Sequence, residues 1–440
     1  MVLKRKARGP LLWGADGAYG LTESPWGNTE IFNADNEDAV YVPEAYGAQL
    51  EEFHEKFYLG PMSREKNRQV VGGLWSKDDG NGEGKGYGKS LLMYNESREI
   101  NRDFGAAKLR AAGCDDEDIE NNPFVSAYCG FEQSKEITAF SAAILDGVAF
   151  ILESPHDEMG NVHLALRERI AEAVGADDGY VSESLADALR KRLRRFRSLN
   201  MQLTHASVTK FIQKLCADDT EEVVRFIRQE LGPRVKVRQG FNIVHIFNAF
   251  LQLAGVNYVT YCVDQVENFG RFSRNQDRDL KMLRESMCQT APTSAMASFI
   301  FQMHVHALEA IEGWWDRVEH LPSLDPSVRA NRPRLVNLQG LTRRKEAECL
   351  AAAGLKSRRP AGYKPPSDLH PFDRDIIESV RQHVHGNPRD FCRTLDNILK
   401  RGEDDRQERF DLDYVTDILE EQEEDLSLVD ADDDLVNPER

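Results

Sequence analysis

A glycine-rich segment, Gly82–Ser90, constrains the fold of this chain more than any other feature of its sequence. It follows the apolar run Val70–Trp75 and precedes the run Leu91–Tyr94, so the expected order is strand, loop and helix. Closely spaced glycines let backbone N–H groups surround a phosphate, while a lysine such as Lys89 reaches the terminal phosphates and a hydroxyl such as that of Ser90 binds Mg²⁺. The N-terminus of the helix would add its dipole to the same anion site. The segment therefore predicts a site for ATP or GTP.

The glycine-rich segment departs at one position from the usual G-x-x-x-x-G-K-[ST] spacing, because Glu83 stands where the first glycine belongs. The neighbours Gly82 and Gly84 flank that position. The stretch Ser76–Gly82 is also polar and rich in glycine, so a flexible surface loop is the alternative for this segment taken alone. The residues expected to contact the nucleotide are Gly84, Lys85, Gly86, Tyr87, Gly88, Lys89, Ser90 and Leu91.

The composition of the chain indicates a globular protein of several domains. Its 440 residues predict two or three domains, and 41% hydrophobic residues are enough for a substantial core. No apolar run approaches the roughly 20 residues that a membrane span needs. The seven cysteines are widely spaced and form no C-x-x-C pair, so neither a disulfide framework nor a zinc site is indicated. We therefore expect a cytoplasmic protein without membrane contact.

The net charge of −18 is concentrated at the C-terminal end of the sequence. Residues 403–440 contain 17 acidic and 3 basic residues, which leaves the preceding part of the chain nearly neutral. Like charges at this density repel one another and oppose compaction. Apolar residues within this segment, Leu412, Val415, Ile418 and Leu419, nevertheless recur at helical spacing. The sequence predicts a disordered acidic tail that either increases solubility or folds onto a partner or onto a basic face of the protein itself.

Strand-like and helix-like segments alternate along most of the chain, which predicts an α/β fold with a parallel sheet covered on both faces. The predicted strands are Gln69–Trp75, Phe124–Phe131, Tyr258–Val263, Ser298–Met303 and Leu335–Leu338. The predicted helices include Glu44–Leu59, Ala139–Leu152, Ile243–Leu253 and Phe372–Val384. Between about residues 155 and 235 the period is helical throughout, which indicates a helical insertion between two strands.

A second motif follows the strand Tyr258–Val263, which ends directly in Asp264. Open α/β sheets bind ligands at the carboxyl ends of their strands, and Mg²⁺ takes one or two carboxylates while it keeps several waters. An acidic cap on a buried strand is the alternative, but the position downstream of the glycine-rich segment favours a metal ligand. If the bound nucleotide is hydrolysed, Gln265 can orient the attacking water molecule but cannot accept its proton. Glu267 is the nearest carboxylate that could accept that proton, or it caps the following turn.

A third motif lies between two helices near the C-terminal end. Gly386 suits the end of the helix Phe372–Val384, Asn387 suits an N-cap and Pro388 suits the first helical position. Arg389 then lies in the first turn of the next helix, at a fixed place on a helical bundle. The alternative is an ordinary helix–turn–helix with a solvated arginine.

Two of these motifs resemble those of one protein family. The string Asp264–Glu267 resembles the Asp-Gln-Phe-Glu form found in bacterial STAND NTPases, which are relatives of the origin-recognition branch of AAA+ proteins. The segment Gly386–Arg389 is similar to the sensor-2 turn in the lid of these ATPases, where the arginine reaches the γ-phosphate. With the glycine-rich segment as Walker A and Asp264 as Walker B, residues 60–402 resemble a P-loop NTPase of the AAA+ class.

This resemblance implies a P-loop three-layer core with a parallel sheet, a helical insertion and a C-terminal helical lid. It also implies a change of shape with the bound nucleotide, and oligomerisation. The expected organisation is an N-terminal arm and helix at 1–60, a core at 61–340 with the insertion at about 155–235, a lid at 341–402 and the acidic tail at 403–440.

The family also implies two residues that the sequence does not single out. A polar sensor-1 residue at the end of the strand Ser298–Met303 would be Gln302 or His304. An arginine finger that completes a neighbouring subunit's site would come from one of three arginines, and no spacing rule selects among Arg271, Arg274 and Arg317.

A run of basic residues, Arg190–Arg197, lies opposite a Leu/Phe stripe on one predicted helix. It could contact the phosphates of DNA or RNA, since each neutralised phosphate adds salt-dependent affinity. A solvated face paired with nearby acids explains it equally well. No zinc-finger pattern and no winged-helix module accompany it.

The combined expectation is an ATPase that uses ATP and Mg²⁺. Lys89 and the loop glycines would bind the phosphates, Ser90 and Asp264 would hold Mg²⁺, and Arg389 would report the nucleotide state to the lid. Glu267 and Gln265 would position the attacking water, with slow turnover. The first hypothesis is a hydrolase that drives a multiprotein assembly acting on nucleic acid, for example in genome defence. The alternative is an ATP-dependent switch or scaffold with little turnover.

Overall fold

The computed structural model describes most of the chain but not all of it. The described residues are 12–14, 16–26, 41–60, 71–76, 86–130, 140–176, 180–195, 203, 205–231, 237–264, 297–303 and 334–422. They fall into two compact units, and each is considered by itself. Unit 1 draws on the ranges 1–50, 85–91 and 338–440, and unit 2 on 51–84 and 92–337.

The centre of unit 2 is a five-stranded sheet in which every neighbouring pair is parallel. In spatial order its strands are β2 (Phe124–Cys129), β5 (Tyr258–Val263), β6 (Ala297–Met303), β1 (Val71–Trp75) and β7 (Arg334–Asn337). They coincide with the five predicted strands to within two residues at each end. The parallel α/β architecture expected from the sequence is therefore confirmed.

One face of this sheet carries the larger hydrophobic core. Because side chains alternate along a strand, Val259, Tyr261 and Val263 of β5 share a face and join this core. The helices α6 (Phe140–Glu153) and α12 (Val237–Leu253) cover that face. Both helices were predicted, although α12 begins six residues earlier than its apolar period indicated.

The opposite face of the sheet is covered by η3 (Glu55–Leu59), which carries Tyr58, and by α3 (Lys89–Arg102). Ser126 of β2 is the centre of a buried polar cluster on this face. The Ser97 hydroxyl lies 2.8 Å from the Ser126 hydroxyl, and the Asn101 side-chain amide donates to the Ser126 carbonyl at 2.8 Å. The Tyr58 hydroxyl lies 3.4 Å from the same serine hydroxyl. Helices therefore lie on both faces of the sheet, which is consistent with three layers.

The predicted helix Glu44–Leu59 is divided into three pieces in the structure. They are η2 (Pro43–Ala45), α1 (Ala48–His54) and η3 (Glu55–Leu59). Gly47 interrupts the segment with a φ of 52°, a left-handed conformation that suits glycine. Hydrophobic spacing indicates which residues are buried, but it does not reveal such an interruption.

The helical stretch between β2 and β5 extends the larger core. Its helices after α6 are α7 (Val162–Val174), α8 (Val181–Leu193), α10 (Ala206–Cys216), α11 (Thr220–Arg225) and η5 (Phe226–Leu231). Shorter elements of unit 2 are α4 (Ala106–Ala111), α5 (Asp116–Asn121), β3 (Pro155–His156) and β4 (Gly160–Asn161). The buried apolar residues of α7, α8, α10 and α11 belong to the same hydrophobic cluster as the sheet.

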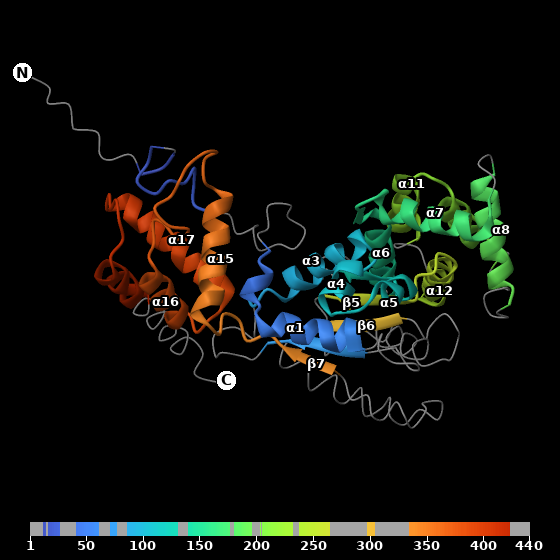
Figure 1. The fold of residues 1–440 in the computed structure, drawn as a ribbon, viewed down its shortest axis with the longest axis horizontal. Helices are drawn as coiled ribbons and strands as arrows, with labels where there is room; N and C mark the ends of the chain where they lie inside the picture. Colours follow the sequence, from blue (N-terminus) through green and yellow to red (C-terminus); the bar gives the residue numbers. More distant parts are fainter. Residues whose placement is uncertain are drawn as a thin grey trace, which may run out of the picture. The chain divides into compact units, whose positions relative to one another are not determined.

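Unit 1 has a separate hydrophobic core built mainly from C-terminal helices. These are α15 (Arg344–Ser357), α16 (Arg374–His383) and α17 (Pro388–Asp404), drawn side by side in orange to red in Figure 1. The N-terminal segment 16–26 packs on them through buried Tyr19, Leu21 and Trp26. The N-terminal arm predicted as 1–60 thus contributes its described residues up to 50 to the same unit as the C-terminal helices.

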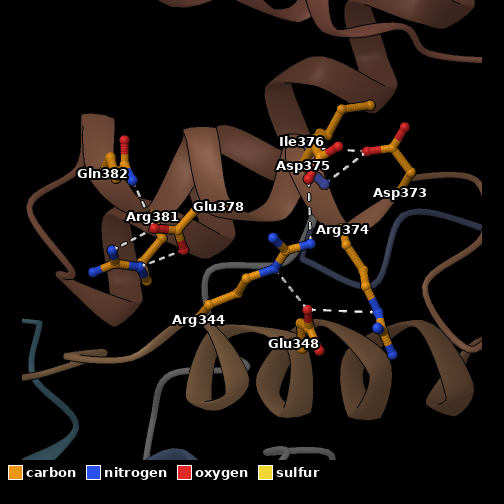
Figure 2. A network of polar contacts seen from close by, with 9 residues as sticks. All are labelled: Arg344, Glu348, Asp373, Arg374, Asp375, Ile376, Glu378, Arg381 and Gln382. Atoms are coloured by element: carbon orange, nitrogen blue, oxygen red, sulfur yellow. Dashed lines mark hydrogen bonds and ion pairs between the residues drawn. The ribbon is translucent and has the colours of Figure 1, made fainter.

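Polar contacts on the surface of unit 1 connect α15 and α16 (Figure 2). Arg344 pairs with Glu348 of its own helix at 2.9 Å and with Asp375 of α16 at 3.3 Å. Within α16, Arg381 and Glu378 form a two-pronged ion pair at 2.7 and 2.8 Å. Solvent-exposed pairs such as Arg344–Asp375 each contribute between about 0 and 1 kcal/mol, so apolar burial remains the main source of stability.

The segment predicted to be an acidic, disordered tail, 403–440, differs from that expectation over its first part. Helix α17 continues to Asp404, and residues 412–422 form a further helix. Phe410, Val415, Ile418 and Leu419 are buried in the core of unit 1. The charge averaged over the whole segment concealed a helix whose apolar face is sufficient to dock. Residues 423–440 lie outside the described residues.

Candidate functional site

The described end of the glycine-rich loop, residues 86–88, belongs to unit 1 together with the first three residues of the following helix, 89–91. Gly86 and Gly88 have φ values of 89° and 75°, left-handed conformations that other residues rarely adopt. Helix α3 begins directly afterwards at Lys89, whose side chain is buried, with Ser90 as the second residue. The predicted contact residues Gly84 and Lys85 lie outside the described residues.

The turn between α16 and α17 has the local structure that the sequence predicted. His385 and Gly386 have φ values of 50° and 77°, which ends the preceding helix. The Asn387 side chain caps α17 by accepting from the N–H groups of Arg389 and Asp390 at 3.0 and 3.4 Å. Pro388 is the first residue of α17. The position of Arg389 in the first turn is therefore fixed by backbone geometry.

The loop and this turn are in direct contact within unit 1. The Arg389 N–H donates to the Gly86 carbonyl at 3.2 Å, while it also donates to Asn387. A Cβ atom on Gly86 would lie 2.7 Å from Asn387 Oδ1 and 2.9 Å from Arg389 Cβ. Two of the three motifs found in the sequence are thus neighbours in space, and the absence of a side chain at residue 86 allows their close approach.

A third backbone segment, which follows β7, joins the same site. The Leu341 N–H donates to the Gly386 carbonyl at 2.8 Å, and the Arg381 guanidinium donates to the Leu341 carbonyl at 3.2 Å. Gly340 has a φ of 74°, and a Cβ atom there would lie 2.3 Å from the Gly386 carbonyl oxygen. The segment is therefore fixed against the turn by hydrogen bonds and by close packing.

Two residues of the N-terminal region form hydrogen bonds to the glycine-rich loop and to the segment that follows β7. The Tyr46 hydroxyl donates to the Gly88 carbonyl at 3.0 Å. The Gln49 side-chain amide donates to the Gly340 carbonyl at 3.1 Å and accepts from the Gln339 N–H at 2.5 Å. Sequence reasoning did not identify either residue, because neither lies in a motif. The only available signal was a polar group on an otherwise apolar helical face.

These segments enclose a pocket that lies entirely within unit 1. Its empty volume is about 710 Å³ when the open space at its mouth is included. The loop residues Gly86, Tyr87, Gly88 and Leu91 line it together with Arg389. Much of the remaining lining is apolar and includes Trp26, Val42, Leu338, Leu341, Leu350 and Cys392. A flat, mostly apolar ring with a charged substituent near Arg389 would suit this lining.

The electrostatic environment of Arg389 favours an anionic partner. Burial lowers the pKa of its guanidinium, and the positive charge of Arg393 lowers it further, whereas Asp390 acts in the opposite direction. A guanidinium that has lost part of its hydration gains more from an anion than a fully solvated one does. Arg389 is therefore suited to bind a phosphate in the pocket that it lines.

In unit 2, the carboxyl ends of three neighbouring strands form one edge of the sheet. Val263 pairs with Phe301, so the next residues along β5 and β6, Asp264 and Gln302, lie side by side. Gln302 pairs in turn with Leu74 of β1. Both Asp264 and Gln302 are buried, with 1% and 6% of their surface exposed. The predicted Walker B aspartate and one of the two sensor-1 candidates therefore share this edge.

The order of the strands reverses direction within this sheet. The chain leaves β1 toward the β2 side of the sheet, returns through β5 and β6, and then crosses β1 to form β7 on its other side. In open α/β sheets, ligands generally bind beyond the carboxyl ends of the strands at such a reversal. Strand β1 ends at this edge with Trp75, which pairs with Met303 of β6.

Several predicted residues lie outside the described part of the chain. They are Gln265, Glu267, His304, Arg271, Arg274 and Arg317. Of the basic run Arg190–Arg197, residues up to 195 are described. Arg190 pairs with Asp187 at 3.2 Å and Arg192 donates to Gln252, so part of this run is paired internally. No helix among the described residues has the length and apolar character to cross a membrane.

Comparisons with known proteins found no match to this chain, either among protein-family models or among curated proteins and solved structures.

Proposed function

We propose that this protein is an ATPase of the AAA+/STAND type that couples ATP binding to movement of its C-terminal helices. The observation that carries the proposal is the contact between the glycine-rich loop and the Arg389 turn, where the Arg389 N–H donates to the Gly86 carbonyl at 3.2 Å. The residues of the glycine-rich segment predict a phosphate there, and the family resemblance implies that Arg389 reaches the γ-phosphate. Their joint lining of one pocket supports a single triphosphate between them.

Within this proposal, the apolar lining around Trp26 and Leu350 accommodates the adenine base, and the phosphates lie toward the N-terminus of α3. The helix dipole and the N–H groups of its first turn favour an anion there. Lys89 binds the terminal phosphates and Arg389 contacts the γ-phosphate. ATP therefore binds through residues from the N-terminal region, the loop and α17 together.

A magnesium ion would be held by the Ser90 hydroxyl and the Asp264 carboxylate. Both are hard oxygen donors of the kind that Mg²⁺ prefers, and Asp264 is a buried carboxylate at a sheet edge where ligands bind. When bound, the metal neutralises charge on the phosphates. Gln302 is the described sensor-1 candidate at the same edge, while Gln265 and Glu267 would orient the attacking water.

The proposed output is a change of shape in an assembly of several subunits, and two versions remain. In the first, hydrolysis drives work on nucleic acid, in keeping with the basic residues of Arg190–Arg195. In the second, bound ATP acts as a switch with little turnover, in keeping with glutamine at position 265, since an amide cannot accept the proton of the attacking water.

Equilibrium binding of a fluorescent ATP analogue tests the core of the proposal. We expect Lys89→Ala and Arg389→Ala each to weaken binding at least about tenfold, because a charge-assisted contact to phosphate contributes about 1.5–3 kcal/mol. Lys364→Ala and Arg393→Ala are the matched controls. Lys364 is an exposed lysine of unit 1, and Arg393 lies one turn after Arg389 with a half-exposed side chain. Unchanged affinity in both site variants would refute the proposal.

Turnover measurements separate the two versions. ATP hydrolysis is measured with and without DNA for the unmodified chain and for Glu267→Gln. DNA-stimulated turnover that is lost in the variant supports the first version, in which hydrolysis drives work on nucleic acid. Tight ATP binding without turnover in either protein supports the switch.

A further inference from the structure

The Asp264 carboxylate has a buried hydrogen-bond donor on the neighbouring strand. The Tyr128 hydroxyl donates to Asp264 Oδ2 at 2.5 Å, and both residues are nearly inaccessible to solvent. The parallel register of β2 and β5 pairs Tyr128 with Cys262, two residues before Asp264. Because side chains two apart on a strand point to the same face, Tyr128 and Asp264 meet on the face that α3 covers.

The ring of Tyr128 is fixed by aromatic neighbours. Tyr94 of α3 meets it edge to face, with ring centroids 5.4 Å apart and an interplanar angle of 84°. Phe150 of α6 packs against both tyrosine rings at 6.1 and 5.5 Å. A hydroxyl carried on a ring held in this way has little freedom, so it can fix the orientation of the carboxylate that it contacts.

We propose that Tyr128 is a positioning residue for the divalent cation, in that its hydroxyl holds the Asp264 carboxylate in the orientation required to bind Mg²⁺ or the water molecules of Mg²⁺. This inference rests on the function proposed above, in which Asp264 serves the metal. It adds a residue that no motif in the sequence indicates.

The chemistry of the pair is compatible with this role. An ionised carboxylate offers about four lone pairs, and the hydrogen bond from Tyr128 to Oδ2 uses one of them. The hydrogen bond also restricts rotation of the carboxylate, which lowers the entropy lost when the metal binds. Outer partners of metal ligands typically change metal affinity about 10–100-fold when they are removed.

The test compares Tyr128→Phe with Tyr94→Phe in the full-length chain. Each variant removes one hydroxyl and keeps an aromatic ring of the same cluster, but the Tyr94 hydroxyl faces Arg98 rather than Asp264. The readouts are the Mg²⁺ concentration that half-saturates binding of a fluorescent ATP analogue, the affinity for Mn²⁺ measured by electron paramagnetic resonance with ATP present, and the thermal midpoint. ATP-analogue affinity in EDTA reports any damage to the nucleotide pocket itself.

We expect Tyr128→Phe to raise the half-saturating Mg²⁺ concentration about tenfold and to weaken Mn²⁺ binding by a similar factor. Binding in EDTA should not change, and Tyr94→Phe should match the unmodified chain in all readouts. An unchanged metal dependence in Tyr128→Phe overturns the inference. A loss of binding in EDTA as large as the loss in Mg²⁺ also overturns it, because the hydroxyl would then serve the fold rather than the metal.

Asp264→Asn separates failure of this inference from failure of the function on which it rests. If Asp264→Asn leaves the metal dependence unchanged, the assignment of Asp264 to the metal is wrong. If Asp264→Asn shifts the metal dependence and Tyr128→Phe does not, only the role of Tyr128 is wrong. In the double variant, Tyr128→Phe should add no further shift, since its effect acts through the carboxylate.

Discussion

At the scale of single residues, Gly86 combines two demands that only glycine meets. Its φ of 89° lies in the left-handed region, and a Cβ atom there would lie under 3 Å from both Asn387 and Arg389. Gly362 has a similar φ of 80°, but a Cβ atom there would meet nothing within 4 Å among the described residues beyond its chain neighbours. The two glycines therefore separate the cost of the backbone conformation from the cost of losing the contact between the loop and the turn.

We expect Gly362→Ala to lower the free energy of unfolding by about 1–2 kcal/mol, which is the cost of a left-handed non-glycine residue. Gly86→Ala should lower it further and should also weaken ATP binding, because the loop must move away from the turn. Urea denaturation and titration with the ATP analogue measure the two effects. Equal losses of stability with unchanged binding would contradict the importance of this contact.

A second residue, Glu96, gives a prediction on pH dependence. Its side chain is 1% exposed and contacts the Lys108 ammonium at 2.7 Å and the His54 ring. Burial alone would raise the pKa of this carboxyl, but the hydrogen bonds and charges of His54 and Lys108 lower it from 4.5 to about 2. Since the folded chain holds this proton less tightly than the unfolded chain, Glu96 stabilises the fold above about pH 4.5. That contribution is lost as the pH falls toward 2.

The variant Glu96→Gln should therefore be less stable than the unmodified chain by about 3 kcal/mol at neutral pH. The difference should shrink as the pH is lowered from about 4.5 to 2. Glu99→Gln on the same helix is the control, because Glu99 is half exposed and pairs with Arg102 at 3.3 Å. Its effect should stay below about 1 kcal/mol at every pH. Chemical denaturation across this pH range provides the measurement, and a pH-independent difference would contradict the assignment.

At the scale of elements, the helix at 412–422 has a buried side and an exposed side. Leu419 is 5% exposed and lies in the core of unit 1, whereas Leu412 on the same helix is 44% exposed. Tyr414 of this helix packs on Phe410, with ring centroids 6.1 Å apart. The helix thus belongs to the folded unit despite the acidic residues around it.

We expect Leu419→Ala to cost about 2–5 kcal/mol of unfolding free energy, as buried leucines generally do. Leu412→Ala should cost no more than about 0.5 kcal/mol, as exposed substitutions do. The shift in the urea midpoint measures both, and equal effects would mean that this helix is not docked in solution.

The elements that the sequence predicted well are those that local chemistry determines. The strand Tyr258–Val263 is a continuous apolar run, and its ends were predicted to the residue. The turn at Asn387 was predicted because capping and proline preferences act within a few residues. The interruption at Gly47 was not predicted, because the apolar spacing continues across it. Residues 403–422 were predicted to be disordered because of the net charge of the whole tail, although four apolar residues recur there at helical spacing.

The candidate site was predictable only in part. Gly86, Gly88 and Arg389, which line the pocket, belong to motifs that are contiguous in sequence. Tyr46, Gln49 and Tyr128 act through hydrogen bonds to residues distant in the chain. Such contacts depend on which helix packs on which strand, so no local pattern reveals them.

At the scale of the whole molecule, each unit has its own hydrophobic core, and the pocket is lined by residues of unit 1 alone. A ligand that binds only the folded state stabilises it by about 2.7 kcal/mol at a hundredfold excess over its dissociation constant. Stabilisation by bound ATP should therefore be strongest in unit 1, which holds the pocket.

Hydrogen exchange measured by mass spectrometry tests this expectation. ATP should slow exchange in α15, α17 and the loop at 86–91, with little effect on α7 and α10, which pack in the other core. Lys89→Ala should abolish the protection. Protection of α10 equal to that of α17 would show that ATP stabilises the two cores together.

The hydrogen bond from the Arg389 N–H to the Gly86 carbonyl also affects how the protein is made. It joins an early part of the chain to a late one, and Tyr46 and Leu341 border the same pocket. A ribosome must have synthesised the chain beyond Cys392 before all the residues that line this pocket have emerged. A nascent chain that stalls before α17 consequently holds its glycine-rich loop without the segment that completes it.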